Sequence, residues 1–271
     1  MIRTCSPFAA CSLAVLIWLC ASAALAYPGG TPAYQTDAAP FCAACHSSLD
    51  LATLAGAPPE RAKKELAENK HIALIRAGEG GYGELSPEDR ETLIQHVQAV
   101  DQASSVKLSV LPKAKPGEEM TVKVEVTGGA GPVVGVALVD LPHRWQARPI
   151  AGAGWQVVGA PKILGQDFKE QTKWLARRPA EAGRNLSFVN VTDIHSDAAK
   201  GEWGRAQVVW TLRAPTTPGS YPLVAVYWYG TEKASPLGVK QDPIRGKLLR
   251  GGFGGASGRI RFTPVTRVQV Q

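Results

Sequence analysis

The chain has 271 residues, of which 45% are hydrophobic and 20% are charged, and its formal net charge is +7 at pH 7. This composition excludes an intrinsically disordered chain and a membrane-dominated one, and the length allows one large domain or two ordinary ones. The basic residues are scattered among 23 acidic ones, so the sequence lacks the clustered basic surface of a nucleic-acid-binding protein. The mild positive excess instead suits an acidic protein partner.

Residues 1–26 have the pattern of a secretory signal peptide. Arg3 gives the positive start, an apolar run extends from Phe8 to Cys20, and Ala24-Leu25-Ala26 is a small-residue cleavage pattern. We therefore expect cleavage near Ala26 and a periplasmic or secreted protein. No later stretch approaches the roughly 20 uninterrupted apolar residues of a transmembrane helix, so we expect no membrane span.

Cys42 and Cys45 are the cysteines that would remain after export, which excludes a scaffold held by several disulfides. With His46 they form the sequence CAACH, a CxxCH motif typical of c-type haem attachment. In such a site both thiols bond covalently to haem and the histidine binds the iron from one face. We predict one covalently bound haem c, attached through Cys42 and Cys45, with His46 as the proximal axial ligand.

Two other kinds of site also use a CxxC pair. A thioredoxin-like redox pair needs a surrounding βαβ pattern, and a tetrahedral zinc site needs further cysteines. The sequence around Cys42 and Cys45 has neither feature.

Two helices are expected after the motif. The first extends from Pro58 to Arg76, with proline in its first turn and Gly78 after its end. The second begins at Ser86 as N-cap with Pro87 in the first helical position. Its apolar stripe consists of Leu93, Ile94, Val97 and Val100.

The segment from about residue 38 to 103 resembles a small class I cytochrome c. The resemblance rests on the CxxCH motif, on the stretch IRAGEGGYGELSPEDRETLIQHV and on the final amphipathic helix. It implies a small all-α haem domain that carries electrons. Members of that family commonly have a methionine before the last helix, whereas the corresponding stretch here, Glu79 to Glu84, has none.

The second axial ligand must then come from another residue, and we predict His71. It lies upstream of the glycine-rich loop that would pass the haem edge, and imidazole binds haem iron well. We interpret Met120 as a core residue because it shares a strand face with Val122 and Val124. The other histidines considered are His96, His143 and His195.

A vacant sixth position is the remaining alternative. It would bind a small ligand, and catalysis there would need a distal acid or base. Glu79, Tyr82 and Glu84 are close enough in sequence to be considered for that role, although exposed loop positions are the simpler interpretation.

Beyond a polar linker at residues 101–105, the hydrophobic period changes from helical to two, and Met120 to Val126 alternate in the pattern of a half-buried strand. Tyr221 follows a Pro-Gly turn, as does the corner tyrosine of immunoglobulin-like domains. Further strands are expected around residues 106–112, 132–140, 154–160, 185–192, 206–213, 221–229 and 259–270. The set resembles an antiparallel immunoglobulin-like β-sandwich.

The sequence thus predicts a multidomain α-then-β fold: a signal peptide at 1–26, an all-α cytochrome c-like haem domain at 27–103 and an immunoglobulin-like β-sandwich at 106–271. The predicted function is single-electron transfer between periplasmic redox proteins, with the sandwich as docking module. Two alternatives stay open: a five-coordinate haem protein that binds or converts a small ligand, and a partner-binding module with a structural haem.

Overall fold

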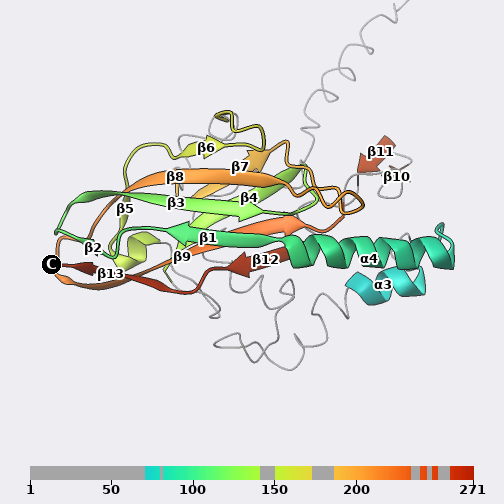
Figure 1. Cartoon of the computed structure of the whole chain (residues 1–271), viewed down its shortest axis with the longest axis horizontal. Coiled ribbons are helices and arrows are strands. Elements are labelled where there is room, and N and C mark those ends of the chain that lie inside the picture. Colours follow the sequence, from blue (N-terminus) through green and yellow to red (C-terminus); the bar gives the residue numbers. More distant parts are fainter. Residues whose placement is uncertain are drawn as a thin grey trace, which may run out of the picture.

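The structure is a computed structural model, and β-sheet is the main secondary structure of the part it describes (Figure 1). Strands make up 44% of the described residues and helices 18%. The described residues are 71–79, 82–140, 150–172, 186–232, 239–242, 246–249 and 257–271.

The strands are β1 (Ser105–Ser109), β2 (Lys113–Ala114), β3 (Glu119–Thr127), β4 (Val133–Val139), β5 (Gln156–Val157), β6 (Lys162–Leu164), β7 (Phe188–Thr192), β8 (Arg205–Arg213), β9 (Gly219–Gly230), β10 (Val239–Asp242), β11 (Gly246–Leu249), β12 (Gly258–Phe262) and β13 (Thr266–Val270). The helices are α3 (Ala73–Ala77), α4 (Pro87–Ala103) and the short 3-10 helix η3 (Ile150–Ala153).

These strands form two large sheets and one small pair. One sheet has the order β1-β3-β8-β5, with β6 also pairing with β8, and the other has the order β2-β13-β9-β4-β7, with β12 also pairing with β9. β10 pairs with β11. The pairings are antiparallel except that β13 and β2 run parallel, so the second sheet is mixed.

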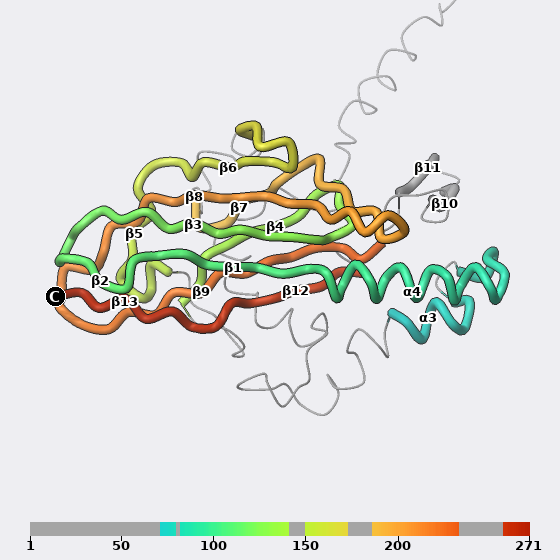
Figure 2. The backbone as a smooth tube through the Cα atoms, in the orientation of Figure 1, coloured from blue at the N-terminus to red at the C-terminus, as the bar shows by residue number. Residues whose placement is uncertain are grey.

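The predicted fold class is wrong. An all-α cytochrome domain followed by an antiparallel sandwich requires a helical unit with its own core, and the described residues contain no small all-α domain. Their two α-helices bury a small cluster, and α4 leads into the sheet with only Ser104 between Ala103 and β1. Figure 2 shows this directly, with the backbone of α4 continuing into β1.

The main core lies between the two large sheets, because one side of β3 and β8 is apolar at every second residue. Met120 and Val122 of β3 are buried, and Val122 lies opposite Trp210 of β8. Leu223 and Tyr227 of β9 belong to the same core. The interpretation of Met120 as a core residue is therefore confirmed.

β9 is the central strand of the second sheet and is buried on both faces. Its residues Leu223, Ala225, Tyr227 and Tyr229 belong to the main core. A second apolar cluster on the opposite face contains Ala137, Val139, Phe188, Val224, Val226, Trp228 and Ile260. This double burial explains why the segment is apolar at consecutive positions instead of alternating.

The start of α4 is confirmed. The Ser86 side chain accepts a hydrogen bond from the Asp89 backbone amide at 3.1 Å, and Pro87 is the first helical residue. The predicted linker at 101–105 is wrong, because Asp101 to Ala103 form the last turn of α4. Of the predicted helix at 58–76, residues before His71 lie outside the described part, and its end at Gly78 is confirmed by a C-cap with φ of +72°.

The expected strand at 259–270 is two strands, β12 and β13, separated at Pro264, which lacks a backbone N–H and cannot extend the ladder. Tyr221 does hold the turn before it, because its hydroxyl donates to the Thr217 carbonyl at 2.8 Å. In the described part of the chain, neither α-helix is long and apolar enough to cross a membrane.

Candidate functional site

The predicted haem-attachment residues Cys42, Cys45 and His46 lie outside the described residues, and so do His143 and the predicted signal peptide at 1–26. Among the sequence-predicted axial ligands, the structure describes His71, and it places this side chain among buried polar groups.

His71 lies two residues before the start of α3, in the π-helical turn that leads into the helix, and is fully buried, with 0% of its surface exposed. Its Nδ1 lies 3.0 Å from Arg259 Nη2, and its Nε2 contacts Glu232 Oε1. Tyr82, in the turn between α3 and α4, donates its hydroxyl proton to the same Glu232 oxygen at 2.5 Å. We call His71, Tyr82, Glu232 and Arg259 the His71 cluster.

The His71 cluster joins segments that are far apart in the chain. Glu232 follows the end of β9 and lies 161 residues after His71, and Arg259 of β12 lies 188 residues after it. All four side chains are at least nine-tenths buried. The cluster therefore attaches the helical segment to one end of the second sheet.

A second layer of polar contacts continues from Arg259 across β12 and β9. Arg259 Nε lies 3.5 Å from Asp101 Oδ2 on α4. Asp101 also accepts the Tyr229 hydroxyl proton at 2.6 Å, and Arg261 donates through Nε to the Tyr229 oxygen at 2.7 Å. Strand alternation puts Arg259 and Arg261 on the same face of β12, so both guanidinium groups reach the last turn of α4.

The donors and acceptors of the His71 cluster define its chemistry. An arginine side chain has no acceptor, so Nδ1 of His71 accepts from Arg259 and the ring proton is on Nε2, facing Glu232. A histidine that acts as a general base or binds iron needs a nitrogen with an available lone pair. In this arrangement neither nitrogen of His71 offers one.

Burial also changes the acidity of the tyrosines beside this cluster. Burial, followed by the negative charge of Asp101, raises the pKa of Tyr229 well above its ordinary value. Burial alone raises the pKa of Tyr227, whose ring stacks on Tyr229 with centroids 4.7 Å apart. Burial lowers the pKa of Arg259, and the charge of Asp101 opposes that shift.

These raised pKa values predict alkaline instability. Above about pH 10 an unfolded chain loses its tyrosine protons while Tyr227 and Tyr229 keep theirs in the folded state, so stability falls by about 1.4 kcal/mol per pH unit for each tyrosine. In Tyr227→Phe and Tyr229→Phe variants, urea unfolding at pH 9, 10 and 11 should show a shallower fall than in the wild type. An unchanged slope in both variants would contradict this explanation.

The other candidates are placed as follows. His96 is half-buried on α4, and Glu79 and Glu84 are exposed. Tyr82 is buried at 8% exposure and bonded to Glu232, so the interpretation of Tyr82 as an exposed loop residue is wrong. His195, which follows β7 in the chain, is exposed. In the described segments no three His, Cys, Asp or Glu side chains are grouped as a metal site.

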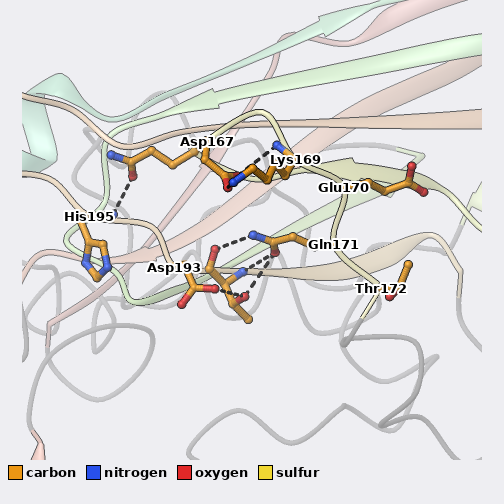
Figure 3. A pocket seen from close by; sticks show the side chains of 9 residues that line it. Asp167, Lys169, Glu170, Gln171, Thr172, Asp193 and His195 are labelled. Carbon is orange, nitrogen blue, oxygen red and sulfur yellow. Dashed lines mark hydrogen bonds and ion pairs between the residues drawn. The ribbon is translucent and has the colours of Figure 1, made fainter.

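The hollow beside His195 has a volume of about 710 Å³ (Figure 3). The Gln171 side chain forms two hydrogen bonds of 2.9 Å with the Thr192 backbone, and His195 donates its backbone N–H to Gln166 at 2.8 Å. Lys169 lies 3.3 Å from Asp167, and its backbone N–H lowers the pKa of that carboxyl. The bonds of Gln171 and Gln166 join the stretch after β6 to the end of β7 and the turn that follows it, so these polar groups bond within the fold.

Sequence reasoning missed Glu232 and Arg259 as partners of His71. Glu232 lies in YWYGTEK after a long apolar strand and has no local signal of burial, and Arg259 follows a glycine-rich stretch. One signal was available: Arg259 and Arg261 alternate with Ile260 in a strand that is otherwise apolar.

In comparisons with known proteins, no family model matches this chain and no curated protein is significantly similar to it.

Proposed function

We propose that this protein is an exported monohaem c-type protein that passes single electrons between redox partners. The observation that carries the proposal is the sequence Cys42-Ala43-Ala44-Cys45-His46. The chemistry of this donor set fits haem c, because two thiols at this spacing and the next imidazole match what covalent attachment and proximal ligation require. Bound haem c would supply reversible one-electron exchange at iron.

The rest of the chain supports an extracytoplasmic carrier with a protein partner. The predicted signal peptide at 1–26 directs the chain to the compartment where covalent haem attachment is proposed. Removal of residues 1–26 with Arg3 lowers the net charge from +7 to +6, and this positive charge favours an acidic redox protein, since opposite charge speeds encounter. In this proposal the part of the chain that forms the two large sheets is the docking module.

The test is covalent haem attachment in the protein exported with the c-type haem-attachment machinery of its host. The wild type should carry one haem that survives denaturation and acid-acetone extraction. Cys42→Ser/Cys45→Ser should lose it entirely, because no thiol is left to bond. His46→Ala should abolish the native visible spectrum of the haem. His96 lies on α4, and His96→Ala should leave haem attachment unchanged. A wild type without covalent haem would overturn the proposal.

A second candidate function is favoured by the geometry of His71. If its two nitrogens keep their contacts with Arg259 and Glu232, the iron lacks this histidine as its sixth ligand, and a vacant position would bind a small molecule such as carbon monoxide. The reduced wild type should then be high-spin and change its Soret band on addition of carbon monoxide. A reduced protein that is low-spin and indifferent to carbon monoxide would favour the electron carrier instead.

A further inference from the structure

We infer that His71 is a positioning residue that attaches the helical segment to the second sheet through both ring nitrogens, and that it is not the sixth ligand of haem iron. The part that concerns iron rests on the proposed function. The part that concerns positioning rests on the described contacts alone.

The first step is the fixed direction of the two hydrogen bonds. Arg259 is always a donor, so it requires the Nδ1 lone pair of His71, and the Nε2 proton then points to Glu232. To bind iron, one of these two nitrogens would have to give its lone pair to the metal. Ligation would therefore displace either Arg259 or the Nε2 proton, together with its bond to Glu232.

The second step is burial. His71 is 0% exposed, Arg259 3% and Glu232 5%, so water cannot replace a contact that His71 gives up. Loss of a hydrogen bond to a buried charged group costs more than loss of a surface one, because the group keeps its desolvation penalty. The cluster is therefore a strong restraint on where His71 lies.

The third step is topology. α3 and α4 bury a small apolar cluster of Ile72, Ile75, Tyr82, Ile94 and Val97. Tyr82 belongs both to this cluster and, through its hydroxyl, to the polar contacts with Glu232. The His71 cluster thus links the apolar packing of the helices to β9 and β12, which is the role of a structural junction.

The experiment compares two substitutions at His71 in the haem-loaded full chain. Glutamine has an amide N–H donor and a carbonyl acceptor, so His71→Gln can bond to both Glu232 and Arg259, but its amide is a poor iron ligand. His71→Leu has neither ability. We expect His71→Gln to unfold in urea close to the wild-type midpoint and to keep the wild-type visible spectrum, and His71→Leu to unfold at a clearly lower urea concentration.

Two outcomes would overturn the inference. If both variants change the haem from low-spin to high-spin and make it bind carbon monoxide, His71 is the sixth ligand. If His71→Gln is as unstable as His71→Leu, the paired hydrogen bonds are not what His71 contributes. Where the wild type carries no covalent haem, the proposed function fails, while the urea midpoints of the two variants still decide whether His71 positions the helices.

Discussion

Glu232→Gln should lower the free energy of unfolding by about 1–3 kcal/mol, because two buried hydrogen bonds lose their charged acceptor. Glu232 is 5% exposed and its Oε1 accepts from both His71 and Tyr82. It also contributes to the favourable charge environment of Arg259. Glutamine has nearly the same shape but no charge, so the buried guanidinium loses part of its compensation. Urea unfolding of the full chain at pH 7 measures the change.

Glu125→Gln is the matched control for this substitution. Glu125 pairs with Lys123 at 3.2 Å, but their side chains are 40% and 39% exposed. Exposed pairs contribute about 0–1 kcal/mol, so the same chemical change should have little effect there. Equal effects of Glu232→Gln and Glu125→Gln would show that the His71 cluster is not a stabilising network.

A double-mutant cycle with Arg259→Gln separates the coupling from the individual losses. If Glu232 and Arg259 act as one network, the double variant should be less destabilised than the sum of the two single variants. Additive losses would mean that each residue stabilises the fold through separate partners.

Local patterns predicted the local features of this fold. The spacing of Ser86 and Asp89 predicted a helix start that needs only neighbouring residues, and the side-chain to backbone hydrogen bond between them is formed. Alternation from Met120 to Val126 predicted β3, since a strand between solvent and core repeats every two residues. Tyr221 was likewise found from its own turn.

Contacts between distant segments had no such signal. His71 was considered for iron because imidazole binds iron, while its actual neighbours in the described structure are a glutamate 161 residues away and an arginine 188 residues away. A single sequence carries no record of which residues meet. For the same reason Tyr82, which lies in a glycine-rich stretch typical of an exposed loop, was not expected to be buried.

The predicted fold class was wrong because it makes the helical residues before about 104 an all-α unit separate from the strands. The change of period near residue 104 marks a real boundary between α4 and β1. Only Ser104 separates α4 from β1 at that point, and Asp101 in the last turn of α4 binds Arg261 and Tyr229 of the sheet. The two described α-helices belong to the same packed structure as the strands.

Trp210→Ala is expected to lower the free energy of unfolding by about 3–5 kcal/mol, because it deletes the largest kind of side chain from a closed core. Trp210 is 0% exposed on β8, lies opposite Val122 of β3, and donates its indole N–H to the Leu186 carbonyl at 2.7 Å. The substitution creates a cavity between the two sheets and leaves that carbonyl without its indole donor. The urea midpoint should fall with little change in the m value.

Trp210→Phe and Leu111→Ala make the interpretation specific. Phenylalanine keeps most of the ring but cannot donate to Leu186, so it should cost about 1–3 kcal/mol. Leu111 is 68% exposed, and its truncation should change stability by no more than about 0.5 kcal/mol. If Trp210 fills the core between the two sheets, the loss of free energy of unfolding should be largest for Trp210→Ala, smaller for Trp210→Phe and smallest for Leu111→Ala. If Trp210→Ala were as mild as Leu111→Ala, the packing of the two large sheets against each other would have to be rejected.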